Sequence, residues 1–494
     1  MRFPKWLRCV ILWSLLGAAG LALLAGGFYT VVRWRGDRAW SEYAAESATR
    51  GETLDVLPVP STLPPERNFM KTPVLERWMF SPIDDPASQQ FLEEIHATKI
   101  SGLDFGSEDS AGWADGESVD FAKTAEAWFK GSPDGNAKAI SSEETPARRL
   151  LAAFAPMDSS LDELRRAALA RPDSELVRPT AIDHQEPLKS PIARFQLARV
   201  FSLGLAAHGC AALVAGKAKE AFGDTLAELK FSRGFTAMPD STLVDSMIGT
   251  VIAKIALQPL WGGCQRNAWS DQHLRQFEDE LSAIRPIESL KRGLRTDRAS
   301  FMLTFDHMSG RVYNHSPWLF WFYWPRGWIQ QSKVAYCTCI QEAIDVQNAA
   351  ATPGFLKRKA GGHARMQALV GSATLWTTPS TYLGLMAVPA IEKPMTAVAG
   401  AEAFVALART ACALERHRLA HGSYPEAVAA LVPEYLPAVP RDVIDGQPLR
   451  YRRLVDDGFK VWSIGINGRD DDGTPVKSST QDARGDWVWL RLAK

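Results

Sequence analysis

The longest hydrophobic run of the chain lies near its N-terminus, where residues 9–32 contain no charged side chain. A helix rises about 1.5 Å per residue, so this run is long enough to cross a hydrocarbon core of about 30 Å. Trp13 and Tyr29 lie near its two ends, where amphipathic rings favour the membrane interface. The pattern predicts a transmembrane helix within residues 1–33. A cleaved signal peptide is the alternative, although its apolar core usually has only about 7–15 residues.

Basic side chains flank this run on both sides, so the flanking charge alone does not decide the orientation of the helix. The basic residues before and after the run are Arg2, Lys5, Arg8, Arg33, Arg35 and Arg38. A single N-terminal anchor with a short basic start usually keeps its N-terminus in the cytoplasm. We therefore expect a cytoplasmic start and the bulk of the chain on the other side of the membrane.

Residues 34–80 are predicted to connect the membrane segment with the folded part. Trp34, Trp40 and Tyr43 alternate with polar residues, which indicates a helix that leaves the membrane and ends at Gly51. Prolines are frequent from residue 57 to residue 73. Because proline fixes φ and lacks a backbone donor, we expect an extended spacer here rather than a packed element.

Residues 81–397 mainly follow a helical period and are predicted to form one helical domain with an acidic insert at 104–146. Four apolar residues recur at a spacing of four: Leu243, Met247, Val251 and Ile255. The helices on either side of Gly216 resemble a helical hairpin. A bundle and a helical-hairpin repeat are both compatible with this pattern.

Polar residues indicate where some of these helices begin and end. Ser160 and Glu163 have the spacing of a capping box, and Ser270 is expected to cap the helix that follows it. A further helix is predicted from residue 329 to residue 350, followed by a joint near 353–363 that is rich in Gly, Lys and Arg.

An aromatic run at 318–328 interrupts the helical pattern, with nearly every residue from Trp318 to Trp324 aromatic. The run is too short to span a bilayer. It fits either a surface that dips into the lipid headgroups or a core segment between helices. We favour the core segment.

The C-terminal stretch 398–494 combines one helix with strand-like runs. The apolar side chains between residues 401 and 419 fall on one face of a predicted helix, and Gly422 is suited to end that helix. Three short runs, 449–453, 459–464 and 487–492, have strand character, and Asp456-Asp457-Gly458 predicts a turn between the first two. The stretch predicts a helix with a small antiparallel sheet.

This module resembles the globular domain of the major pseudopilin of type II secretion. The motifs that carry the resemblance are Gly422-Ser-Tyr424-Pro425, Leu431-Val-Pro-Glu-Tyr435-Leu436, Pro440-Arg-Asp442, Gly446-Gln-Pro448-Leu-Arg-Tyr451 and Trp462-Ser-Ile-Gly465. They cover about a fifth of the chain. Because the module follows the membrane segment at a long distance, we expect a reused folded unit rather than a filament subunit. The whole layout is similar to that of single-pass bacterial envelope proteins, which implies the inner membrane and an extracytoplasmic bulk.

The resemblance implies calcium, because the corresponding acidic loop of that family binds this ion. Calcium takes 6–8 oxygen ligands, and a turn can bring several carboxylates together. The predicted ligands are, first, Asp470, Asp472 and Asp486, and then Asp471 and Asp482. The spacing is not that of an EF-hand, because Ser479 stands where the bidentate Glu would be. A solvated acidic turn is the alternative.

Composition and the remaining motifs exclude several classes. The net charge is zero, which removes the electrostatic argument for nucleic acid. The six cysteines form no CxxC pair and are expected to be buried free thiols, with a disulfide as the alternative in an extracytoplasmic domain. His417 and His421 share a helix face but lack a third metal ligand. No phosphate-binding loop or GxSxG is present, so we identify no catalytic residue and no cofactor other than calcium.

The sequence therefore predicts an α+β protein that is mostly α. It has an N-terminal transmembrane helix, a helical-hairpin or bundle domain, and a small pilin-like helix plus antiparallel sheet. We expect a structural or interaction protein of the cell envelope, not an enzyme, whose partners are the membrane and other proteins. The alternatives are an accessory component of a type II secretion or pilus-like system, and an unrecognised envelope hydrolase.

Overall fold

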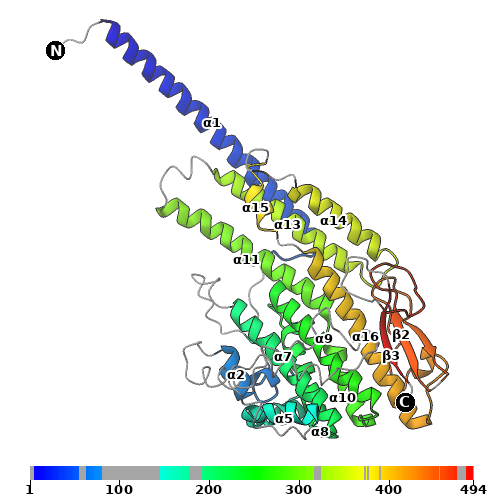
Figure 1. Ribbon diagram of the computed structural model, residues 1–494. Coiled ribbons are helices and arrows are strands. Elements are labelled where there is room, and N and C mark those ends of the chain that lie inside the picture. Colours follow the sequence, from blue (N-terminus) through cyan, green and yellow to red (C-terminus); the bar gives the residue numbers. More distant parts are fainter. Residues whose placement is uncertain are drawn as a thin grey trace. The chain divides into compact units, whose positions relative to one another are not determined.

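The computed structural model describes residues 5–54, 63–80, 145–177, 191–315, 324–371, 374, 378–388, 391–455, 457–475 and 485–492. The described part is mostly helical and carries a three-stranded antiparallel sheet, as predicted for an α+β protein that is mostly α (Figure 1). The chain forms two compact units: residues 1–57, 294–346 and 359–391 belong to one, and the others form the second. The stretch 81–397 contributes to both.

Helix α1 (Lys5–Thr49) is continuous from the apolar run into the polar segment behind it (Figure 1). None of its most apolar stretch is buried inside the protein, which makes the helix compatible with a membrane anchor. Helices α9 (Leu243–Gln265) and α16 (Glu392–His421) are also long and apolar enough to cross a membrane, but most of the apolar stretch of each is buried. Their apolar side chains supply the core of the second unit.

In the first unit, α1 packs against α13 (Arg326–Asn348) through glycines. A Cβ atom on Gly36 would lie 2.3 Å from the carbonyl oxygen of Gly327, so the two backbones touch. The C-terminal part of α11 (Pro286–His315) runs beside α13, since Arg298 bonds Gln341 and Asp306 pairs with Lys333. Helices α14 (Phe355–Gly371) and α15 (Tyr382–Met386) follow along the chain.

The predicted joint near 353–363 is wrong, because most of it is the first half of α14. Glycine destabilises a helix by about 1 kcal/mol relative to alanine, and for this reason a joint was predicted in this segment. Within the first unit, a Cβ atom on Gly362 would lie 2.7 Å from Cγ2 of Val346. The absence of a side chain at Gly362 therefore allows α14 to pack closely against α13.

The second unit contains most of the other helices. Its first elements are η1 (Phe69–Lys71), α2 (Pro73–Phe80), α5 (Pro146–Ala153), η4 (Ala155–Met157) and α6 (Asp158–Ala170). They are followed by α7 (Pro191–Val214), α8 (Ala218–Thr236), α9 and α10 (Asp271–Ala283). Helices α7, α8 and α9 pack against one another, and α16 packs on α9 and α10. Gly216, with φ +78°, makes the short joint predicted between α7 and α8.

The structure confirms one of the two predicted N-terminal helix caps and contradicts the other. Ser270 does cap α10, since its side chain accepts a hydrogen bond from the His273 backbone. The capping box at Ser160 is wrong, because α6 begins two residues earlier and has Asp158 in its first turn, where a negative charge favours a helix N-terminus. A capping box that the sequence analysis missed joins Thr242 and Asp245 at the start of α9.

The described end of the proline-rich segment is packed, which differs from the predicted spacer. Phe69 and Met70 are each only 1% exposed and belong to the core of the second unit. The Asn68 side chain fixes this turn, donating to the Glu175 carbonyl and accepting from the Met70 and Glu175 amides. Burial of Phe69 and Met70 and the hydrogen bonds of Asn68 therefore decide the structure here. The frequency of proline does not show which apolar side chains nearby will be buried.

The C-terminal module has the elements predicted for it. Helix α16 starts at Glu392, earlier than the predicted boundary, and ends before Gly422, whose φ is +77°. After η5 (Val428–Leu431) come β1 (Arg450–Arg453), β2 (Phe459–Ser463) and β3 (Trp487–Arg491) in the order β1-β2-β3. Arg453 pairs with Phe459 across the first hairpin, and Val461 pairs with Trp489 across the second. The sheet packs on α16 (Figure 1).

Candidate functional site

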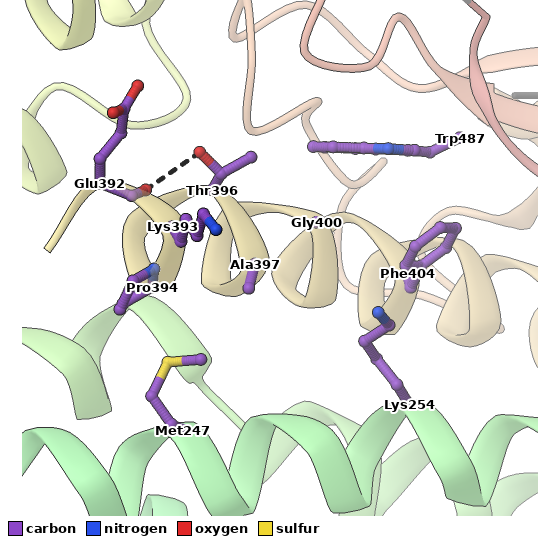
Figure 2. Close-up of a pocket in the computed structure, with 10 residues that line it drawn as sticks. All are labelled: Met247, Lys254, Glu392, Lys393, Pro394, Thr396, Ala397, Gly400, Phe404 and Trp487. Atoms are coloured by element: carbon purple, nitrogen blue, oxygen red, sulfur yellow. Dashed lines mark hydrogen bonds between the residues drawn. The ribbon is translucent and has the colours of Figure 1, made fainter. Parts of the chain in front are cut away.

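A hollow of about 670 Å³ opens between α9, α16 and β3 of the second unit (Figure 2). Helix α9 contributes Met247 and Lys254, the start of α16 contributes its first three turns, and β3 contributes Trp487. The described lining residues are Met247, Lys254, Glu392, Lys393, Pro394, Thr396, Ala397, Gly400, Phe404 and Trp487. The hollow is large enough for several side chains of a bound segment or for a small molecule.

Aromatic rings form one wall of the hollow. Phe404 and Trp487 lie 5.9 Å apart between ring centroids and are tilted by 46°. The indole covers Gly400, where a Cβ atom would lie 3.5 Å from Cζ2 of the ring. Trp487 remains half-buried, so part of the indole faces the hollow (Figure 2). Such a ring offers a large apolar surface at little cost in conformational entropy.

The charged lining residues are mainly basic. The Lys254 side chain rises from α9 toward α16, and Lys393 is exposed at the first turn of α16 (Figure 2). The Glu392 carboxylate points away from α9, and its backbone carbonyl accepts a hydrogen bond of 3.1 Å from Thr396 Oγ1. A hollow that has two ammonium groups and two aromatic rings in its lining suits a ligand that combines negative charge with apolar groups.

The acidic loop fixes the strand that carries Trp487. Asp486 precedes this tryptophan, is 1% exposed, and accepts backbone hydrogen bonds from Asp471 at 3.1 Å and from Gly473 at 2.7 Å. Burial raises the pKa of the Asp486 carboxyl, and these backbone donors partly offset that effect. Asp486, one of the predicted calcium ligands, thus hydrogen-bonds within its own loop and fixes the position of Trp487 at the edge of the hollow.

Three further predicted calcium ligands, Asp470, Asp471 and Asp472, have protein partners. Asp470 accepts from the indole of Trp462 at 2.9 Å and lies 3.7 Å from Arg450. Asp472 accepts from Arg452 at 2.8 Å, and this hydrogen bond is the main cause that lowers its pKa. The structure therefore brings Asp470, Asp471, Asp472 and Asp486 into one loop, with arginines beside two of them.

Asp471 accepts a hydrogen bond of 2.8 Å from the Asn467 amide, and Asp482 lies outside the described residues. Among the residues that are described, no three His, Cys, Asp or Glu side chains form a group that could hold a metal ion. Calcium binding by this loop stays a prediction, and it requires Asp470 and Asp472 to exchange their arginine partners for the ion.

A calcium titration of the detergent-solubilised chain tests that prediction. If the loop binds calcium, millimolar calcium should raise the melting temperature by several degrees, because a ligand that binds only the folded state stabilises it. The increase should disappear in the double variant Asp470→Asn/Asp472→Asn and persist in Asp457→Asn, a change in the neighbouring turn. An unchanged melting temperature at millimolar calcium would contradict the prediction.

The other sequence candidates behave as structural residues. The rings of His417 and His421 stack at 4.2 Å, and their Nδ1 atoms lie 3.0 and 3.1 Å from backbone carbonyls. Five of the six cysteines are buried, as predicted, whereas Cys9 is exposed. Burial raises the pKa of the Cys210 and Cys337 thiols, which disfavours the reactive thiolate.

Sequence reasoning missed a buried polar cluster between α6, α7 and α8. Asp224 accepts from Arg165 at 2.7 Å and lies 2.8 Å from Nδ1 of His208. Burial would raise the pKa of Asp224, but His208 and Arg165 lower it, whereas burial raises the pKa of Glu228, one turn further along α8. The Ser202 hydroxyl donates to Glu228, whose second oxygen has no hydrogen-bond partner within the described part of the chain.

Asp224 and Glu228 are each at most 1% exposed, so this cluster is closed off from solvent and we assign it to the core. The sequence signal for it was weak. The two carboxylates lie four residues apart on one helix, a spacing that is also typical of an exposed face. The hollow was missed for a different reason, since its two helices and its strand are far apart along the chain.

Comparison with protein-family models, with curated proteins and with solved structures finds no match to this chain. The pseudopilin resemblance of the C-terminal module therefore stays a prediction from the motifs quoted above.

Proposed function

We propose that the protein is a single-pass membrane-anchored binding protein of the bacterial inner membrane, with its bulk on the extracytoplasmic side. The observation that carries the anchor is the uncharged run of α1, whose most apolar stretch is not buried. Alkaline carbonate extraction tests this step. The full chain should stay in the membrane pellet, and its release into the supernatant would contradict an integral anchor.

The hollow between α9, α16 and β3 is the surface that we assign to a partner. It combines the Trp487 and Phe404 rings with the ammonium groups of Lys254 and Lys393. The carboxylate of Glu392, which also belongs to the described lining, points away from α9 (Figure 2). A protein segment with an acidic side chain next to an apolar one fits this chemistry, because the ring offers burial and the ammonium groups offer charge complementarity.

Site-specific photo-cross-linking in cells tests the assignment. A photoreactive phenylalanine at Thr396, inside the hollow, should give a discrete adduct with a partner. The double variant Lys254→Glu/Lys393→Glu should reduce that adduct at least fivefold, because it reverses the charge that attracts the acidic segment. The matched control is Lys219→Glu, an exposed lysine on α8 outside the hollow.

Two outcomes would count against the binding role: no adduct at Thr396, or an adduct that the double charge reversal leaves unchanged. The melting temperature and membrane location of the double variant and of Lys219→Glu are measured alongside, so that a lost adduct is compared at equal folding and location.

A second candidate is an accessory component of a type II secretion or pilus-like system. The feature that favours it is the packing of a long helix, α16, against the three-stranded sheet of the C-terminal module. Mild cross-linking followed by purification should then recover secretion components. Adducts at Thr396 that contain none of them would favour the more general binding role.

A further inference from the structure

The N-terminal end of α13, in the first unit, brings two tryptophans and an arginine next to α1. The geometry points to Trp324, Arg326 and Trp328 as an interfacial patch that lies in the lipid headgroup region beside α1. This inference rests on the proposed anchor, because α1 has to span the membrane for the patch to reach it.

The level of this patch along α1 follows from two contacts within the first unit. The Trp328 ring meets the Phe28 ring edge to face, with centroids 6.3 Å apart. A Cβ atom on Gly327 would lie 2.0 Å from the carbonyl oxygen of Val32, so the first turn of α13 touches the last uncharged residue of the run. Phe28 precedes Val32 by about one helical turn, roughly 6 Å along the axis.

The headgroup region on each side of a bilayer is about 5–8 Å thick, so a ring at this level lies within it. Trp324 packs edge to face on Trp328 at 5.9 Å, and both side chains are half-buried. Tryptophan favours this zone, because its ring is apolar and its N–H is polar. Nε1 of Trp324 is buried, so Trp324 contributes ring surface at this height, and the polar contact falls to Trp328 and Arg326.

Helix α13 runs away from the membrane, parallel to the second half of α1. Its first turn lies beside Val32, and Nζ of Lys333 lies 4.2 Å from the ring centroid of Trp40. Only the first turn of α13 therefore reaches the lipid. Thr338, on an exposed side of the same helix, lies about 18 Å further along the axis than Arg326.

Charge around the patch fits phospholipid headgroups. Arg33 and Arg35 follow the apolar run directly and are exposed, and Arg326 is exposed on the first turn of α13. Each basic residue near an anionic membrane surface contributes about 1 kcal/mol of attraction. With α1, the patch gives the first unit two points of contact with the bilayer, which fixes its tilt in a way that one helix cannot.

Depth-dependent fluorescence quenching tests the inference in the full chain, reconstituted into vesicles of phosphatidylethanolamine and phosphatidylglycerol. An environment-sensitive dye is attached to single cysteines at Arg326, Thr338 or Leu16, in a Cys9→Ser background whose other cysteines are buried. Lipids carry a nitroxide either at the headgroup or deep in the acyl chain. We expect the headgroup nitroxide to quench the dye at 326 at least threefold more than the dye at 338.

The dye at Leu16 separates failure of the anchor from failure of the patch. Quenching at 16 by the deep nitroxide, with position 326 as weakly quenched as 338, would overturn the patch and leave the anchor intact. No quenching at 16 would overturn the anchor and the patch together.

Discussion

Replacing Glu415 with alanine is expected to lower the free energy of unfolding of the second unit by about 3–5 kcal/mol, the cost of breaking a buried ion pair. Glu415 lies on α16 with its side chain 3% exposed, and Arg491, on β3, is 5% exposed. The carboxylate accepts from Arg491 Nε at 3.0 Å and from the Tyr424 hydroxyl at 2.8 Å. Alanine would leave both donors buried without this acceptor.

Chemical denaturation of the detergent-solubilised chain, followed by pulse proteolysis of sites in the second unit, measures this loss. The matched control is Glu426→Ala, which removes an exposed partner of Arg453 in the same module and should cost less than about 1 kcal/mol. Glu415→Gln should fall between the two, since it keeps an acceptor for Tyr424 but loses the charge. Equal stability of the Glu415→Ala and Glu426→Ala variants would show that the buried pair does not hold helix and sheet together.

A loss of about 3 kcal/mol, confined to the first unit, is expected for Glu52→Ala. Glu52 follows the end of α1 and accepts two hydrogen bonds from Arg295, at 2.8 and 3.0 Å, and one of 2.9 Å from Arg298. The Arg298 side chain is fully buried and also donates to Gln341. Without Glu52, the buried guanidinium of Arg298 would lose the carboxylate that pairs with it.

This contribution should depend on pH. The hydrogen bond from Arg295 is the main cause that lowers the pKa of Glu52 from 4.5 to about 2. A carboxyl whose folded pKa is depressed stabilises the fold above its unfolded pKa and loses this effect as the pH falls toward the folded one. The difference in melting temperature between wild type and Glu52→Ala should be constant above pH 5 and shrink between about pH 4.5 and pH 2.

Glu42→Ala is the matched control on the same helix, because its partner Arg38 and Glu42 itself are both more than half exposed. It should change stability by less than about 1 kcal/mol at any of these pH values. A Glu52→Ala difference that does not shrink in acid would mean that the side chain acts by packing and not by charge.

The elements of the C-terminal module were largely predictable, whereas its polar contacts were not. Strand alternation and the Asp-Gly turn are properties of neighbouring residues, and all three predicted strands agree with the observed ones to within one residue at either end. The arginine partners of Asp470 and Asp472 come from β1, across the sheet. A carboxylate that looks like a ligand in sequence is an ion-pair partner once a strand with long basic side chains lies beside it.

Errors in the helical part have the same origin. Gly361 and Gly362 indicated a joint, but close contact between Gly362 and the neighbouring helix α13 compensates for poor helix propensity. Proline-rich sequence indicated a spacer, but burial of Phe69 and Met70 packs its end. In both cases a tertiary contact outweighed a local preference, which for glycine in a helix is worth about 1 kcal/mol per residue.

By itself, the sequence determined the features that depend on local chemistry: the apolar helix that is compatible with a membrane anchor, the mostly helical class, and the order of helix and strands at the C-terminus. Only the tertiary structure decided which side chains meet. It placed Trp487 and Lys254 around one hollow, joined Glu415 to Arg491, and set Trp328 against Phe28. The reason is physical: periodicity records which face of an element is apolar, but carries no information about the partner that covers that face.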